Sequence, residues 1–276
     1  MPLPVNYNYY HFHPNKVIGI VATALYGTSA IFHIVQLWHA RAWYFLSLLT
    51  GAFMMTLGYI FRVMGAEDPT NFGPFVAQSI CIVLPPAFYA ATIYMTYGRI
   101  VNHVGRDDLS LVSARKVTKI FLWGDIIAII GQSTGGGLTP NGGSMAKIGD
   151  GITVAGLFVQ LVFFGFFLVV TIVFERRMHA EAFKRPYPKW LILIWVLFFV
   201  AALIIIRCIF RIIEYIQGNE GYLATHEVYL YCFDTLPMFV VQAIFHFWHP
   251  GNILRPKEAQ GIPLTSQGTD SEEATA

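Results

Sequence analysis

Charged residues are scarce in this chain, and their scarcity excludes an ordinary water-soluble domain. Asp, Glu, Lys and Arg make up 12% of the 276 residues, whereas soluble domains contain about 25%. Hydrophobic residues make up 55% of the chain. They gather repeatedly in apolar runs of about twenty residues, the length at which a helix crosses a bilayer.

Cysteines are few, and no phosphate-binding motif is present. Cys81, Cys208 and Cys232 all fall within apolar runs, so they offer no extracellular disulfide framework. The glycine-rich stretch at residues 135–143 is predicted to be a flexible loop. No Gly-Lys-Ser/Thr follows it and no strand precedes it, so it is not a nucleotide loop. The first sixteen residues lack the apolar region of a cleavable signal peptide, and the first span is expected to act as its own insertion signal.

The apolar pattern predicts an all-α integral membrane protein, a bundle of seven transmembrane helices. The predicted spans are residues 17–38, 43–64, 74–99, 117–134, 152–174, 190–213 and 227–248. Pro85-Pro86 is expected to kink the third span, because proline removes backbone hydrogen bonds. Residues 1–16 are predicted to form a short extracellular segment, residues 17–252 the membrane domain, and residues 253–276 a disordered cytoplasmic tail.

The positions of Lys and Arg predict the orientation. Thirteen of the eighteen Lys and Arg residues fall on the side of the first, third and fifth loops and the C-terminus. Only Lys16 and Lys147 fall on the other side, and the remaining three are arginines inside predicted spans. Because cytoplasmic loops carry the excess of basic residues, the N-terminus is predicted outside and the C-terminus in the cytoplasm. The same rule explains the basic loops without any role in binding nucleic acid.

Polar residues inside the predicted spans are the candidates for function, because such groups are costly in hydrocarbon. Arg207, Arg211 and Glu214 lie at i, i+4 and i+7, so they share one helix face. Asp125, Gln160 and Asp234 are expected nearer the middle of the membrane, and the other charged and amide candidates nearer its outer side. The candidate substrate-binding residues are Tyr59, Arg62, Asp125, Gln132, Gln160, Arg207, Arg211, Glu214, Glu227, Tyr231 and Asp234.

Three arginines and four carboxylates stand in this set, so the charges can nearly neutralise one another. One hypothesis is a polar vestibule that opens outward above an apolar floor, where the carboxylates bind an amine and the arginines a phosphate. The other hypothesis is a buried ion-pair network that only fixes the register of the helices.

Three histidines form a second candidate cluster. His33 lies near the cytoplasmic end of the first predicted span, and His246 and His249 lie at the end of the last one. If these helices are neighbours, the three imidazoles could converge on zinc or haem. No cysteine or carboxylate accompanies them, and interfacial histidines are common, so the expectation is a protein without a cofactor.

Several motifs extend along the chain in a recognisable order. They are Gly58-Tyr59-x-x-Arg62, Gln78, Pro86 with Ala90 to Tyr94-Met95, Gly98-Arg99, Ile120-Phe121-x-x-Gly124-Asp125, Gln132-x-x-Gly135-Gly136-Gly137, Gly156-Leu157-x-x-Gln160, Arg207-x-x-Phe210-Arg211-x-x-Glu214-Tyr215-x-x-Gly218, Glu227, Asp234 and His249-Pro250-Gly251. Over about residues 7–254 the chain resembles the fungal RTA1-like family, seven-helix proteins of the lipid-translocating exporter type.

The resemblance implies a fungal membrane protein, usually of the plasma membrane, that exports or flips sphingoid long-chain bases. Its partners would be membrane lipids or amphiphilic small molecules. Relatives are also tied to resistance to toxic amphiphiles and to porphyrin handling. The chain departs from the family at Met55, where a glutamate is typical, and this leaves Arg62 without its obvious partner on the same helix.

Two other classes of function stay open at the level of the sequence. A seven-helix receptor or sensor fits the predicted topology, but the third span ends in Tyr97-Gly98-Arg99 rather than Asp-Arg-Tyr, and the last span lacks Asn-Pro-x-x-Tyr. A metal-dependent intramembrane lipid hydrolase has histidines and carboxylates available, yet these are predicted near opposite membrane faces. Catalysis needs them within hydrogen-bond reach of one another. The sequence therefore favours a translocator that is not an enzyme.

Overall fold

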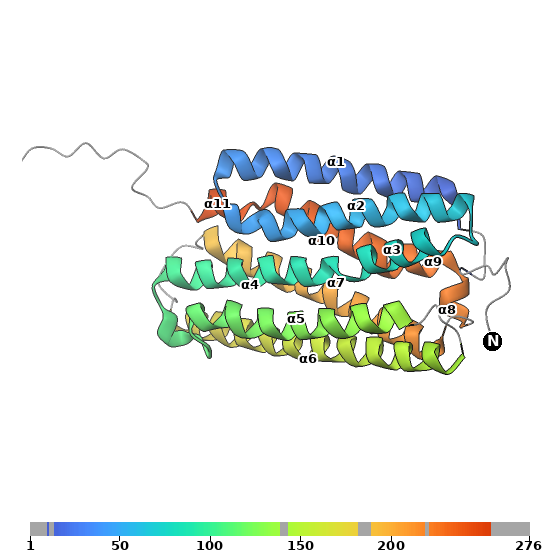
Figure 1. Ribbon diagram of the computed structural model, residues 1–276. Helices are drawn as coiled ribbons and strands as arrows, with labels where there is room; N and C mark the ends of the chain where they lie inside the picture. Colours follow the sequence, from blue (N-terminus) through green and yellow to red (C-terminus); the bar gives the residue numbers. More distant parts are fainter. Residues whose placement is uncertain (1–9, 11–13, 139–142, 182–188, 219–220, 255–276) are drawn as a thin grey trace, which may run out of the picture.

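The structure is a computed structural model that describes Tyr10 and residues 14–138, 143–181, 189–218 and 221–254. These residues form an all-α protein with no strand among them, as the sequence predicts. Long helices run side by side in an elongated bundle (Figure 1). The predicted N-terminal segment and C-terminal tail lie almost wholly outside the described residues.

The helical segments contain the predicted spans, although the helix at residues 143–181 extends well beyond the predicted 152–174 at both ends. In chain order the elements are α1 (Lys16–Ala40), η1 (Trp43–Phe45), α2 (Leu46–Glu67), α3 (Phe72–Val83), α4 (Pro85–Val104), η2 (Asp107–Leu109), α5 (Ala114–Leu138), α6 (Gly143–Glu181), α7 (Lys189–Gln217), α8 (Tyr222–Thr225), α9 (Glu227–Leu230), η4 (Tyr231–Thr235), α10 (Leu236–Phe247) and α11 (Pro250–Ile253).

Six helical segments of the described chain are long and apolar enough to cross a membrane. They are Lys16–Ala40, Trp43–Glu67, Phe72–Val104, Ser144–Ala180, Trp190–Gln217 and Glu227–Ile253. Large apolar side chains such as Val17, Trp38 and Trp195 are exposed on them, as lipid-facing residues are. The fourth predicted span, residues 117–134, lies in α5, which runs beside α6 (Figure 1) and is not among these six. The count of seven and the orientation of the termini stay predictions.

The predicted kink at Pro85-Pro86 is confirmed, because α3 ends at Val83 and α4 begins at Pro85. The break also depends on close packing against α2. A Cβ atom added at Gly51 would lie 2.6 Å from Cε1 of Tyr89 and 3.2 Å from the carbonyl oxygen of Pro85. Glycine therefore lets α2 approach α4 beside the kink.

The prediction of a flexible loop at residues 135–143 is wrong in its first part. Gly135, Gly136 and Gly137 belong to α5, which continues to Leu138, and residues 139–142 lie outside the described chain. At Gly135 an added Cβ would lie 2.2 Å from Oγ1 of Thr153 on α6. The glycine was a sign of helix contact rather than of a loop, since small residues let membrane helices pack closely.

The last predicted span is not one continuous α-helix. It contains α9, the π-helical turn η4 and α10. Pro237 has no N–H to donate to the carbonyl of Phe233, so the regular α-helical pattern cannot pass through it. The helix widens immediately before this proline, and Oγ1 of Thr235 donates to the carbonyl of Leu230 at 3.3 Å. The π turn contains Asp234, and such turns are frequent at functional sites.

Candidate functional site

Asp234 is the centre of a buried ion-pair cluster between α7 and η4. Nε of Arg207 lies 2.5 Å from its Oδ1, and Arg211 binds its Oδ2. Nη1 of Arg211 also lies 2.9 Å from Oε2 of Glu214. The side chains of Arg207 and Asp234 are completely buried. The shared helix face predicted for Arg207, Arg211 and Glu214 is therefore confirmed, since Arg211 pairs with Glu214 and shares Asp234 with Arg207.

Arg207 also connects this cluster to the proline break. Its Nη2 donates to the carbonyl oxygen of Ile82 at 2.9 Å. In a continuous helix that carbonyl would accept from residue 86, but Pro86 has no N–H. The arginine therefore satisfies a backbone acceptor that the prolines leave open, and it fixes α7 to the kink of the third span.

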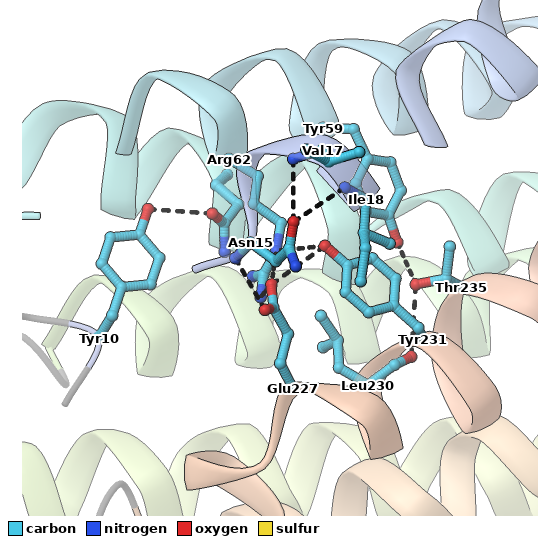
Figure 2. A network of polar contacts seen from close by, with 11 residues as sticks. Tyr10, Asn15, Val17, Ile18, Tyr59, Arg62, Glu227, Leu230, Tyr231 and Thr235 are labelled. Atoms are coloured by element: carbon cyan, nitrogen blue, oxygen red, sulfur yellow. Dashed lines mark hydrogen bonds and ion pairs between the residues drawn. The ribbon is translucent and has the colours of Figure 1, made fainter. Parts of the chain in front are cut away.

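Arg62 and Glu227 form a second cluster at the other end of η4, where α2 meets α9 (Figure 2). Nη2 of Arg62 lies 2.6 Å from Oε1 of Glu227, and its Nε donates to the hydroxyl of Tyr231 at 3.2 Å. That hydroxyl donates in turn to Oε1 of Glu227 at 3.1 Å. Met55 is fully buried, and Arg62 takes its partner from another helix rather than from its own.

The N-terminal end of the chain joins this second cluster. The backbone N–H of Asn15 donates to Oε2 of Glu227 at 2.8 Å, while Oδ1 of Asn15 accepts from the first turn of α1. The hydroxyl of Tyr10 donates to Oε1 of Gln78 at 3.0 Å. Tyr10 is buried, and burial raises its pKa to about 12. The segment that precedes α1 is thus held to α3 by Tyr10 and to α9 by Asn15 (Figure 2).

Hydroxyl groups link the two clusters through Thr235, the residue after Asp234. The hydroxyl of Tyr59 lies 2.5 Å from Oγ1 of Thr235, and the hydroxyl of Tyr26 donates to the carbonyl oxygen of Thr235 at 2.6 Å. The rings of Tyr26 and Tyr59 are stacked with their centroids 5.5 Å apart. The motif Gly58-Tyr59-x-x-Arg62 marks Tyr59 in the sequence, whereas neither a motif nor a charge marks Tyr26 or Thr235.

The remaining three candidates lie in a third place, on α5 and α6. Nε2 of Gln132 donates to Oε1 of Gln160 at 2.9 Å, and both amides are buried. Asp125, two turns earlier on α5, is also buried. Among the described residues, Asp125 is the only one of the four candidate carboxylates without an arginine partner. It interacts electrostatically with Tyr94 and Cys208.

A small recess opens beside Gln132, between α3, α5 and α7. It is lined by Ser79, Ile80, Val83, Leu84, Gln132, Ser133, Gly136 and Tyr215. The lining combines hydroxyls and an amide with aliphatic surface. In the part of the chain that the structure describes, the eleven predicted residues form three groups, and the recess lies beside Gln132 of the third.

The histidines come together in part, at the far end of α10. The rings of His33 and His246 are stacked with centroids 3.9 Å apart. Nε2 of His33 lies 3.0 Å from the carbonyl oxygen of Gln242, and the two ring nitrogens of His246 lie 2.7 Å from Ser29 and 2.9 Å from Gln36. In the part of the chain that the structure describes, no group of three or more His, Cys, Asp or Glu side chains is placed to hold a metal ion.

The histidine pair is also far from the carboxylate clusters. His246 is twelve residues after Asp234, which corresponds to about 18 Å along a helix. His249 caps α11 by accepting from the N–H of Gly251 at 3.2 Å, and its ring packs on Phe45. This separation agrees with the prediction that histidines and carboxylates lie toward opposite ends of the bundle.

The sequence of this chain matches a known protein family over most of its length. The sequence pattern of the family described as RTA1 like protein matches residues 48–257. The chain belongs to the RTA1-like family. It is an integral membrane protein of this family, and all three clusters lie within the matched region, apart from the contacts of Tyr10, Asn15 and Tyr26.

Three relatives from Saccharomyces cerevisiae show the breadth of the resemblance. Protoporphyrin uptake protein 1 is 39% identical over 206 residues, which cover 73% of this chain and 67% of that protein. Protein RTA1 is 31% identical and covers 86% and 83% of the two chains. A sphingoid long-chain base transporter, RSB1, is 25% identical and covers 94% and 77%. No solved structure matches this chain significantly.

Proposed function

We infer that this protein moves amphiphiles with a polar headgroup across a membrane, and that sphingoid long-chain bases are the substrate class. The observation that carries this proposal is the network of three arginines and Asp234, Glu214 and Glu227 inside an apolar bundle. Charged groups at membrane depth are costly, and they mark substrate and ion pathways. The name of the relative RSB1, a sphingoid long-chain base transporter, supports the choice of substrate.

The geometry suggests how a headgroup would engage the network. Each arginine already has a carboxylate partner, so a headgroup must exchange with one of these partners rather than enter an empty charged pocket. Glu214 and Glu227 are the accessible members, because their side chains are 14% exposed whereas Asp234 is fully buried. In this proposal the headgroup passes along the protein while the acyl chain stays in lipid, and the protein is not an enzyme.

The proposed cellular place is the plasma membrane, where such a protein would protect a fungal cell from toxic amphiphiles. A test is growth of cells on a sphingoid base with the wild-type protein, with Asp234→Asn or with Arg211→Ala. Full resistance from both variants, at normal amounts of folded protein, would remove these residues from the pathway.

A paired variant separates stability from function at the second cluster. Arg62→Gln with Glu227→Gln removes both charges and keeps hydrogen-bonding side chains, so it should fold better than either single change. We expect loss of resistance from the paired variant with folded protein still present in the plasma membrane.

A further inference from the structure

Asp125 differs from every other carboxyl group in the buried network. It is 1% exposed, no Lys or Arg of the described residues forms an ion pair with it, and its polar neighbour is the hydroxyl of Tyr94. The arginines that sequence analysis counted as its possible partners are bound elsewhere, Arg62 to Glu227 and both arginines of α7 to Asp234. A buried carboxyl group in such surroundings is stable in its neutral, protonated form and becomes a carboxylate when a cation lies beside it.

The groups around Asp125 are suited to this change of charge. The hydroxyl of Tyr94 on α4 interacts with it and has no other hydrogen-bond partner in the described chain. Cys208 on α7 is the other titratable group that interacts with it. Neither group carries a positive charge, so among the described residues no permanent cation pairs with Asp125. The hydroxyl of Tyr94 can accept a hydrogen bond from the protonated carboxyl group or donate one to the carboxylate.

Asp125 lies on the face of α5 that also lines the recess. Gln132 lines the recess and lies seven residues after Asp125, on the same face of α5 and about 10 Å along the helix axis. Ser79, Ser133 and Tyr215 supply further polar groups in the lining of the recess.

We propose that Asp125 is the binding site for the ammonium group of an amphiphilic primary amine, and that it releases a proton when the amine binds. The protonated carboxyl group gives its proton to water, and the resulting carboxylate pairs with the R-NH₃⁺ headgroup. The charge of the site is zero before and after, so no uncompensated charge is left in the bundle. This assignment rests on the proposed function and narrows it to cationic headgroups, with one proton exchanged for each amine.

The test is isothermal titration calorimetry of the full-length protein in detergent at neutral pH, with sphingosine as the amine. Measurement in two buffers of different ionisation enthalpy counts the protons released. N-acetylated sphingosine, which has no basic nitrogen, is the matched ligand. The variant Asp125→Asn has the same shape without the titratable group, and Asp108→Asn, in the exposed turn η2, is the matched control variant.

For the wild-type protein and Asp108→Asn we expect about one proton released for each sphingosine bound and none for the acetylated ligand. Asp125→Asn should release no proton and bind sphingosine at least about tenfold more weakly, because the charge-assisted contact is lost. The number of protons released by the wild-type protein tests the proposal even if the Asp125→Asn protein does not fold. Zero release, or equal release and affinity in Asp125→Asn, would overturn the assignment.

Movement of sphingosine across liposomes separates this inference from the proposed function. Proton-coupled binding without movement would leave Asp125 as an amine site and refute translocation. Movement with an unchanged proton count in Asp125→Asn would support translocation and refute the role of Asp125. Absence of both binding and movement would refute both.

Discussion

Arg62 and Glu227 are 165 residues apart in the chain, and Nη2 of Arg62 lies 2.6 Å from Oε1 of Glu227. The pair joins α2 to the beginning of the last span, and the N–H of Asn15 joins α1 to the same carboxylate. The carboxylate of Glu227 on α9 therefore binds groups from both α1 and α2. This arrangement replaces the same-helix partner that Met55 does not provide.

Replacement of Glu227 by Gln should destabilise the bundle, because it leaves the guanidinium of Arg62 buried without a counter-charge. We expect a loss of about 2–4 kcal/mol, slightly below the usual range for a broken buried pair because Glu227 is partly exposed. Thermal unfolding in detergent measures this change.

The matched control is Glu67→Gln at the exposed pair with Lys16, where both side chains are more than half exposed. Removal of a surface pair should cost less than about 1 kcal/mol. Equal losses in Glu227→Gln and Glu67→Gln would show that the buried pair does not hold α2 and α9 together.

Two neighbouring glycines of α5 should respond to alanine in opposite directions. At Gly135 the new Cβ would lie 2.2 Å from Oγ1 of Thr153 and 2.4 Å from the carbonyl of Gly149, so α5 and α6 must separate. We expect a loss of about 1–3 kcal/mol. At Gly137 nothing lies within 4 Å, and Gly137→Ala should gain up to about 1 kcal/mol of helix propensity. Thermal unfolding of both variants in detergent tests the contact between α5 and α6. A Gly135→Ala protein as stable as the wild type would contradict this contact.

The buried position of the Tyr10 ring requires that residue 65 has no side chain. A Cβ at this position would lie 2.0 Å from the hydroxyl of Tyr10, so Gly65→Ala should expel the ring into water. The pKa of Tyr10 should then fall from about 12 toward its ordinary value.

Spectrophotometric titration checks this prediction, with the Tyr10→Phe proteins as references to isolate one tyrosine. In the wild-type protein, burial favours the neutral phenol, so the stability linked to Tyr10 is complete below its ordinary pKa of 10 and is lost as the pH rises through about 12. No such loss should occur in Gly65→Ala. Titration of Tyr10 near pH 10 in the wild-type protein would show that its ring is not buried against Gly65.

Gln242 is a buried amide of α10 that no sequence motif marks, and it connects three helices. Its Oε1 accepts from the hydroxyl of Tyr89 at 2.9 Å, and its Nε2 donates to the carbonyl oxygen of Tyr26 at 3.3 Å. Gln242→Leu should cost about 1–3 kcal/mol because these groups lose their partner. Addition of Tyr89→Phe should recover part of the loss, since no hydroxyl is then left unpaired. Strictly additive losses would contradict the contact.

The sequence predicted the long helices well and the local breaks less well. Apolar runs have the length of a membrane span, and two adjacent prolines must interrupt a helix, so both features were visible in advance. The helical state of Gly135–Gly137 was not, because it depends on contact with Thr153 of α6. The π turn at residues 231–235 was missed for a similar reason, although Pro237 was the available signal.

The candidate site was predicted as a set of residues rather than as an arrangement. Helical spacing placed Arg207, Arg211 and Glu214 on one face, and charge counting predicted mutual neutralisation. Neither helical spacing nor charge counting could show that Arg207 and Arg211 both pair with Asp234, so that Asp125 has no arginine partner. That division depends on how α7 and η4 meet, and the spacing within one helix contains no information about it.

The most direct test of the account is movement of a labelled sphingoid base across liposomes that contain the purified wild-type protein, against protein-free liposomes. The account predicts faster movement in proportion to the amount of protein, with weaker movement for the N-acetylated base and for the Arg62→Gln, Glu227→Gln paired variant. Equal rates with and without folded protein would contradict it.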